Sequence, residues 1–172
     1  MTPRIPAAPA SPAPAAPSAG AAGPDDGAAG PDRLAGAGLA AEPFFLMARA
    51  STMGSSQANR ALTELGLKVR HYSVLGLACS GLEPTQRELS QFLVLDPSQI
   101  VAIIDELERR GAVERRTDPR DRRSKILVPT PAGEELYARA RELVAGATAR
   151  SLAALTEEER DRLLDLLRRA AF

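Results

Sequence analysis

Apolar residues recur at helical spacing from Pro43 onward, so most of the chain is predicted to be helical. The first helix is expected to open at Pro43, because proline suits the first helical position, and to end before Gly66. A shorter and more apolar helix is expected in the segment KVRHYSVLGLACS, where Gly81 stops it. These two helices precede the segment whose pattern is most specific.

A capping box predicts a third, short helix. Thr85 and Glu88 are three residues apart, so each side chain can accept a hydrogen bond from the backbone amide of the other. The helix is expected to run from Thr85 to about Leu93 and to be followed by a short break.

A longer helix is predicted after this break. Asp96 is a strong N-cap, Pro97 suits the first helical position, and Gln99 can close a second capping box. Gly111 is expected to end the helix. Its apolar stripe follows the helical repeat and consists of Ile100, Ile103, Ile104 and Leu107. A short helix, a tight break and a longer helix together predict a helix-turn-helix.

The pattern that follows predicts a β-hairpin and then two more helices. The segments AVERR and SKILVP are expected to form short strands, joined by the polar turn TDPRD. Thr130 and Pro131 start a long helix, AGEELYARARELVAGATARSLAAL, and Thr156 with Glu159 forms another capping box before the last helix. The expected fold class is therefore mainly α with a small β-hairpin.

The first 41 residues differ from the rest of the chain. They are almost entirely Ala, Pro, Gly and Ser, so little apolar burial can repay the entropy of ordering them, and residues 1–41 are predicted to be a disordered tail. One domain is expected at 42–172. The last helix of this domain presents an apolar face that we expect a partner subunit to cover, formed by Leu163, Leu164, Leu166 and Leu167.

Composition restricts the possible settings of the protein. The 22 Lys and Arg residues balance 22 Asp and Glu residues, so net charge indicates no particular partner. The single cysteine, Cys79, rules out an internal disulfide, and the single histidine, His71, leaves too few soft ligands for an ordinary zinc site. No apolar run approaches the roughly 20 residues that span a bilayer, and no export signal is recognisable. A cytoplasmic protein without a membrane partner is expected.

The distribution of charge is more informative than its sum. Two aspartates, Asp118 and Asp121, accompany six cations in the predicted hairpin: Arg115, Arg116, Arg120, Arg122, Arg123 and Lys125. One interpretation is a solvated loop in which these charges pair locally. The other is the wing of a winged helix, which places a cation in the DNA minor groove. In a wing the aspartates would orient the turn, Asp121 either by holding an arginine or by stabilising the turn itself. The position directly after a helix-turn-helix favours the wing.

The stretches ELSQFLVLDPSQIVAIIDELERRGAVERR and DPRDRRSKILVPTPAG resemble the MarR family of winged-helix transcriptional regulators. The wing residues that match the family's pattern are Asp118, Asp121, Arg122, Arg123, Thr130 and Gly133. The resemblance covers everything except the tail. It implies a winged helix-turn-helix lobe at about 67–130 and a helical dimerisation layer from about 43–65 and 131–172. It further implies a homodimer that binds a pseudo-palindromic, double-stranded DNA operator as a ligand-responsive repressor.

The second helix of the helix-turn-helix is expected to read bases. Many relatives carry polar or basic residues throughout this helix, whereas this chain leaves Ser98 and Gln99 as the obvious hydrogen-bonding readers. Gln99 could equally serve as the helix cap, because both roles need the helix N-terminus.

The wing is expected to contact the DNA backbone and the minor groove. Arg120 and Arg122 are the candidates for insertion into the minor groove, and Arg123 and Lys125 are expected to approach phosphates. The whole set of expected DNA contacts comprises Thr85, Gln86, Pro97, Ser98, Gln99, Val101, Ala102, Arg115, Arg120, Arg122, Arg123 and Lys125.

The resemblance also implies a small aromatic or phenolic effector in a crevice between the dimer layer and the DNA-binding lobe. Met47, His71, Tyr72 and Leu75 are the candidates to line this crevice. The alternative is structural: Tyr72 and Leu75 lie at helical spacing and can belong to the core, and His71 can be held in structural hydrogen bonds.

Oxidant sensing through Cys79 is a less favoured alternative. No cation adjoins the cysteine in GLACSG to lower the pKa of its thiol, and a free cysteine is usually a small buried apolar residue. Family members that sense oxidants also place their cysteine near the start of the first helix.

Two further classes of function compete with DNA binding. An enzyme is not expected, because the chain has no Gly-rich phosphate loop, no nucleophilic triad and no metal-ligand cluster, and no cofactor is expected. A winged helix used for protein contacts is the other alternative, although a wing with six cations suits it only if the partner is acidic. Salt-dependent binding to duplex DNA would exclude both.

Overall fold

The computed structural model describes residues 31–172, and the predicted disorder of residues 1–30 lies outside this range. Residues 31–41, the remainder of the segment predicted to be a disordered tail, form two short 3-10 helices, Pro31–Gly36 and Gly38–Ala41. Such turns need only local hydrogen bonds and no apolar core. An example is the bond from the Ala40 amide to the Ala37 carbonyl, at 2.9 Å. The compact unit with the predicted winged helix spans Ala41–Phe172.

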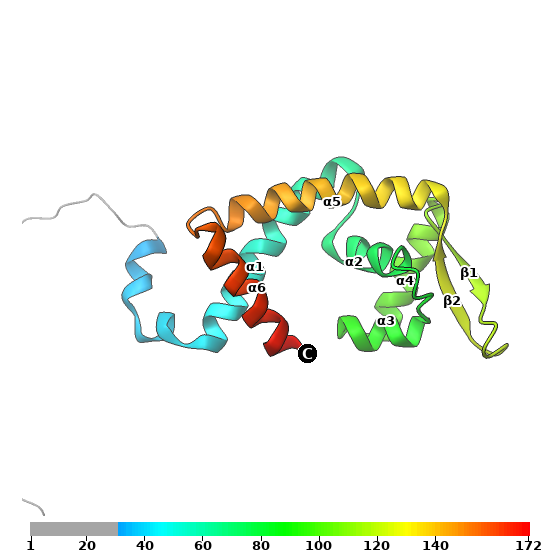
Figure 1. Ribbon diagram of the computed structural model, residues 1–172, viewed down its shortest axis with the longest axis horizontal. Helices are drawn as coiled ribbons and strands as arrows, with labels where there is room; N and C mark the ends of the chain where they lie inside the picture. Colours follow the sequence, from blue (N-terminus) through cyan, green and yellow to red (C-terminus); the bar gives the residue numbers. More distant parts are fainter. Residues whose placement is uncertain (1–30) are drawn as a thin grey trace, which may run out of the picture. The chain divides into compact units, whose positions relative to one another are not determined.

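The elements of this unit follow the predicted order, and the expected fold class is confirmed. Helix α1 packs against α5, whereas α2, α3 and α4 lie together beside the hairpin (Figure 1). In chain order the elements are α1 (Pro43–Leu62), the 3-10 turn η3 (Thr63–Leu65), α2 (Val69–Ala78), α3 (Gln86–Leu93), α4 (Pro97–Arg109), β1 (Val113–Thr117), β2 (Lys125–Pro129), α5 (Pro131–Ser151) and α6 (Glu157–Ala171).

The capping boxes predicted for α3 and α6 are present. At the start of α3, the Glu88 amide donates to the Thr85 hydroxyl at 3.2 Å, and the Thr85 amide donates to the Glu88 carboxylate at 2.7 Å. The Thr85 amide and hydroxyl thereby hold the pKa of Glu88 below its ordinary value. Thr156 and Glu159 make the same pair of bonds at the start of α6.

The hairpin is fastened to the start of α3. Its strands are antiparallel, with Val113 opposite Pro129 and Thr117 opposite Lys125. The Leu127 amide donates to the carbonyl of Pro84, just before α3, at 2.8 Å. The turn covers residues 118–124 and so extends beyond the predicted TDPRD. Because the base of the hairpin is anchored, the position of its tip depends on the helices beneath it.

The predicted apolar stripe of α4 lies in the core. Ile100, Ile104 and Leu107 are completely buried and Ile103 is 8% exposed, in one cluster with Leu75 of α2 and other apolar residues. Burial of one such side chain contributes on the order of 2 kcal/mol. Since the stripe occupies one face of α4, the opposite face is left to solvent.

Gly133 allows α5 to approach the end of α4 closely. A Cβ atom at this position would lie 1.8 Å from the carbonyl oxygen of Ala112, so no other residue fits without a shift of the backbone. Gly111, in the left-handed region with φ +67°, terminates α4 next to this contact. The Thr130 hydroxyl donates to the Gly111 carbonyl and accepts from the Gly133 amide, which joins α5 to the base of the hairpin.

Candidate nucleic-acid interface

The first turns of α4 present an exposed face on the side opposite the buried stripe. Exposed positions on this face are Pro97, Ser98, Gln99, Val101 and Ala102. They combine one amide side chain with small and apolar groups, which suits hydrogen bonds to base edges and contacts with thymine methyl groups. The geometry is that of a helix available to a DNA groove.

The structure distinguishes Ser98 from Gln99 at the start of α4. Asp96 caps α4 through its carboxylate, which accepts from the Ser98 amide at 2.8 Å and from the Ser98 hydroxyl at 2.5 Å. These bonds lower the pKa of Asp96. Gln99 closes no capping box, because the Asp96 carboxylate accepts from the amide of Ser98 rather than from that of Gln99, and the Gln99 side chain makes no bond back to the Asp96 amide. Of the two side chains, that of Gln99 is therefore the more available for contacts outside the helix.

A depression between α3 and α4 extends this face. It is lined by Gln86, Arg87, Ser90, Gln91, Pro97 and Val101. Of the two residues expected at the start of α3, Thr85 is engaged in its capping box and the Gln86 amide oxygen accepts from Arg115 at 3.1 Å. The sequence reasoning missed Arg87, an exposed cation in the first turn of α3. Arg87 follows the N-cap residue Thr85 by two positions, and this spacing in the sequence could have indicated an exposed cation at the start of the helix.

Arg115 is directed into the lobe and is bound there. Its guanidinium donates to Asp105 at 2.6 Å and to Glu108, both on α4, as well as to Gln86 on α3. Its side chain is only 22% exposed. Two carboxylates thus offset its charge, so Arg115 joins the first strand to the helix pair more directly than it offers a cation to DNA.

Asp118 and Arg120 form a side-chain pair at the start of the turn. The Asp118 carboxylate accepts from the Arg120 amide at 2.8 Å and from its guanidinium at 2.9 and 3.0 Å. Asp118 is 4% exposed, whereas the side chain of Arg120 is 62% exposed. The hydrogen bonds from Arg120 hold the pKa of Asp118 below its ordinary value. The aspartate therefore orients an arginine that still reaches solvent.

The second aspartate of the turn has a different role. Asp121 accepts from the Arg123 amide at 3.0 Å and from the Ser124 hydroxyl at 3.1 Å. These bonds stabilise the turn, which agrees with the turn-stabilising interpretation of Asp121. Among residues 31–172, no arginine side chain donates to this carboxylate.

The cations of the hairpin fall into two groups within the described residues. Arg116 pairs with Glu114, as Arg115 and Arg120 pair with the acidic residues described above. The side chains of Arg122 and Arg123 are exposed and form no ion pair with another described residue. Lys125 donates to the hydroxyl of Thr117 at 2.8 Å and keeps an unbalanced charge. The positive charge that is not offset thus lies at the tip and on the second strand.

The four residues expected to line an effector crevice do not form one site. Leu75 is completely buried in the core, as its structural alternative expects. His71 is held between the Lys68 amide, at 3.2 Å, and the Glu106 carboxylate, at 3.0 Å. Met47, on α1, is 54% exposed. Leu75 and His71 therefore agree with the structural alternative, in which Leu75 belongs to the core and His71 is held by hydrogen bonds.

Tyr72 packs on a second tyrosine. Its ring stacks on that of Tyr137 of α5, with the centroids 5.5 Å apart and an angle of 29° between the planes. Burial, together with the hydrogen bond to Tyr137, raises the pKa of Tyr72. This pair connects α2 to α5.

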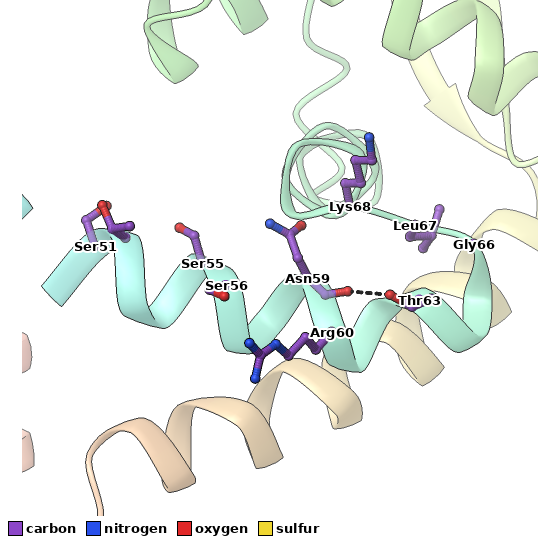
Figure 2. Close-up of a pocket in the computed structure, with 10 residues that line it drawn as sticks. Ser51, Ser55, Ser56, Asn59, Arg60, Thr63, Gly66, Leu67 and Lys68 are labelled. Atoms are coloured by element: carbon purple, nitrogen blue, oxygen red, sulfur yellow. Dashed lines mark hydrogen bonds between the residues drawn. The ribbon is translucent and has the colours of Figure 1, made fainter. Parts of the chain in front are cut away.

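An open groove of about 880 Å³ lies along α1 and the connection from α1 to α2 (Figure 2). Ser51, Ser55 and Asn59 lie on the side of α1 that faces Lys68, and Arg60 projects from the other side (Figure 2). The full lining consists of Ser51, Thr52, Ser55, Ser56, Asn59, Arg60, Thr63, Gly66, Leu67 and Lys68. The groove thus combines hydroxyl and amide groups with two cations, and none of the four expected residues lines it.

Cys79 is half buried at the end of α2. Burial and, secondarily, the nearby charge of Glu134 raise the pKa of its thiol. A raised pKa disfavours the thiolate, the form that reacts with oxidants. The surroundings of Cys79 therefore weigh against the oxidant-sensing alternative.

Two features are absent from residues 31–172. No helix in this range has the length and apolar character to cross a membrane. The same residues contain no group of three or more His, Cys, Asp or Glu side chains placed to hold a metal ion.

Comparison with known proteins gives one consistent set of relatives. Residues 65–124 match the model of the MarR family. A transcriptional regulator (MarR family) from Rhodococcus sp. RHA1 is 40% identical, with a TM-score of 0.71 over 75% of this chain and 91% of that chain. CouR from Rhodococcus jostii RHA1, in a crystal structure with p-coumaroyl-CoA, is also 40% identical, with a TM-score of 0.70 over 78% of this chain and 94% of that chain.

A third structure is that of a transcriptional repressor, CouR, bound to a 23-mer DNA duplex. It is 31% identical, with a TM-score of 0.71 over 78% of this chain and 95% of that chain. The similarity in all three cases extends well beyond the helix-turn-helix.

Proposed function

Since the chain belongs to the MarR family of transcriptional regulators, we propose that it is a repressor that binds an operator in double-stranded DNA as a homodimer. The observation that carries this proposal is the exposed polar start of α4 together with a hairpin tip whose Arg122 and Arg123 have no acidic partner among the described residues. A helix for the major groove and a cationic wing for the adjacent minor groove are the two parts that a winged helix needs.

Each part has a distinct task in the proposed complex. Gln99 reads base edges, and Val101 and Ala102 present methyl groups that can meet thymine. Arg120, oriented by Asp118, enters the minor groove, and Arg123 neutralises a phosphate. Arg122, the other candidate for the minor groove, is assigned to a phosphate instead, because no acidic partner among the described residues orients its side chain. Lys125 approaches the DNA backbone. Arg115 supports the wing from within the protein, through its bonds to α3 and α4.

Apolar side chains on the terminal helices support the proposed dimer. Leu164, Leu166 and Leu167 of α6 are each about half exposed, and Phe44 and Met47 of α1 are exposed at 78% and 54%. Exposed apolar groups of this size, on helices that flank the DNA-binding lobe, are typical of a subunit interface. A two-fold dimer would present its two recognition helices to a pseudo-palindromic operator.

The proposed effector is a small aromatic acid or its coenzyme A thioester. CouR, with 40% identity, was crystallised with p-coumaroyl-CoA. On the side of α1 that faces Lys68, the lining of the groove includes Lys68, which can bind a phosphate or a carboxylate, and hydroxyl groups that can bind a polar aromatic substituent. Binding there would shift the dimer away from its DNA-binding state.

The test of the proposed function is selection of genomic fragments by the purified full chain, followed by titration of the best fragment. The expected result is one enriched pseudo-palindromic sequence, bound at least about a thousandfold more tightly than random duplex of the same length. Addition of p-coumaroyl-CoA or salicylate to the complex then tests the effector. Equal affinity for operator and random DNA, with a weak dependence on salt, would contradict the DNA-binding proposal.

A further inference from the structure

The connection between α1 and α2 lies between the groove and α4. Gly66, Leu67 and Lys68 belong to the lining of the groove. The same connection is bonded to the C-terminal end of α4, because the Arg110 guanidinium donates to the Leu65 carbonyl at 3.1 Å and to the Gly66 carbonyl at 2.7 Å. One short segment therefore contacts both the groove and the helix expected to read DNA.

His71 provides a second link from this connection to α4. Its Nδ1 atom accepts from the Lys68 amide at 3.2 Å, so the ring carries its proton on Nε2, which donates to Glu106 at 3.0 Å. The other carboxylate oxygen of Glu106 accepts from Arg110 at 2.7 Å. The Glu106 carboxylate thus accepts hydrogen bonds from both His71 and Arg110. These bonds, of which the one from His71 has the larger effect, lower the pKa of Glu106.

Asn59 completes the network on the groove side. Its amide oxygen accepts from the Val69 amide, at the first residue of α2, at 2.9 Å, and the side chain itself lines the groove. The segment between the helices has little regular structure of its own, with Gly66 in the left-handed region at φ +63°. Its position is therefore determined largely by the side chains that hold it.

We propose that His71, Glu106 and Arg110 form a relay that couples occupancy of the groove to the position of α4. This inference rests on the proposed function. A ligand that presses on residues 66–68 displaces the Leu65 and Gly66 carbonyls, which accept hydrogen bonds from Arg110. It also displaces the Lys68 amide, which donates a hydrogen bond to His71. Helix α4 is rigid and extends about 16 Å from Arg110 to Gln99, so a tilt at its C-terminal end moves the base-reading end.

Linkage makes the relay testable from the DNA side without an effector. If the groove connection and the DNA-binding end of α4 are coupled, operator binding must alter the connection by the same coupling free energy. The amides of Lys68 and Val69, which His71 and Asn59 hold, report this change through their hydrogen exchange.

The experiment measures hydrogen exchange by mass spectrometry in the peptide covering residues 63–70, with and without a saturating selected operator. The full-length parent is compared with Glu106→Gln, which keeps the shape of the side chain, and with Arg110→Ala. The control is Glu64→Gln, because Glu64 lies on the same connection and forms no ion pair with another described residue. Melting temperature and operator affinity are measured for each protein.

The relay predicts that operator slows exchange of this peptide at least about fivefold in the parent and in Glu64→Gln. In Glu106→Gln the slowing is lost, while operator affinity stays within about threefold of the parent. If Arg110→Ala unfolds, the conservative Glu106→Gln variant still decides the result. Parent-like slowing in Glu106→Gln, or no slowing in a parent that binds its operator, would overturn the relay.

A second arm uses p-coumaroyl-CoA as the probe. Where the probe weakens operator binding by the parent, Glu106→Gln should retain less than about a fifth of that fold-change. If the probe has no effect on the parent, only the effector part of the proposed function fails, and the exchange measurement still judges the relay. A parent that binds no operator removes the proposed function and the relay together.

Discussion

The buried carboxylate of Asp118 accepts hydrogen bonds from both the backbone amide and the guanidinium of Arg120, two residues further along the turn. Asp118 carries a negative charge next to the surface proposed for DNA, and its removal would strengthen binding if charge alone mattered. The geometry predicts the opposite result, because the carboxylate fixes the direction of an exposed arginine. The entropy of an unrestrained arginine side chain, on the order of 2 kcal/mol, would otherwise oppose its insertion.

Replacement of Asp118 should therefore weaken operator binding. We expect Asp118→Ala to raise the operator Kd by about tenfold, equivalent to about 1.4 kcal/mol, although it removes a negative charge. Fluorescence anisotropy with a labelled operator measures the change in Kd. Asp121→Ala is the control, because it removes hydrogen bonds that stabilise the turn but none to an arginine side chain, so its effect on Kd gives the part that is due to the turn alone. Tighter binding by Asp118→Ala would show that charge rather than orientation dominates at this position.

The hairpin cations should divide into two functional groups. Arg122→Ala and Arg123→Ala should each reduce the slope of log K against log salt by about one unit, because each removes one phosphate contact. Arg115→Ala should instead lower the melting temperature, since it leaves Asp105 and Glu108 without their shared partner. Arg116→Ala, at an exposed pair, is the matched control. Unchanged salt slopes in both tip variants would identify the charged stretch as a solvated loop.

Gln99 and Ser98 should also differ. Gln99→Ala should cost on the order of 1 to 3 kcal/mol on the operator, with a much smaller effect on random DNA and little change in melting temperature. Ser98→Ala removes a hydroxyl that is bonded to Asp96, so it should act mainly on helix stability. Paired titrations and thermal melts of the two variants distinguish these roles. A loss of affinity in Ser98→Ala alone would reverse the assignment.

The capping box at the start of α3 predicts a specific dependence of stability on acid. The pKa of Glu88 in the folded protein is lower than its ordinary value, about 4.3. Its contribution to stability is therefore complete above that ordinary value and is lost as the pH falls through the folded value. Glu88→Gln keeps an acceptor and cannot titrate, so its melting temperature should fall less than that of the parent below about pH 4.5.

The control for this measurement is Glu158→Gln in the first turn of α6, because the Glu158 side chain forms no hydrogen bond or ion pair with another described residue. This variant should follow the parent through the acid range. Parallel melting curves for Glu88→Gln and the parent would mean that the carboxylate contributes no pH-dependent stability to the folded lobe.

Cys79 should not mediate regulation. Because its half-buried thiol has a raised pKa, we expect slow alkylation by iodoacetamide at neutral pH compared with a free cysteine. Cys79→Ser should retain operator binding in the presence of peroxide. A parent released from DNA by peroxide, next to a variant that stays bound, would restore the oxidant-sensing alternative.

The sequence by itself determined the helices, their caps and the buried stripe of α4. Thr85, Asp96 and Thr156 cap the predicted helix starts, and each partner lies within three residues along the chain. Such interactions depend on local geometry, so the spacing of residue types is sufficient to predict them. The hairpin and its charged turn followed from the same local signals, and the wing pattern supplied the resemblance to the family.

Only the tertiary structure decided which of these side chains are free to act. Arg115 and Arg122 look equivalent in the sequence, yet packing of the hairpin on α4 gives Arg115 two carboxylates and leaves Arg122 exposed. Packing also buries Leu75 completely and brings His71 to Glu106, 35 residues away. Partners so distant in the chain depend on how whole elements pack together, and hydrophobic periodicity carries no information on that arrangement.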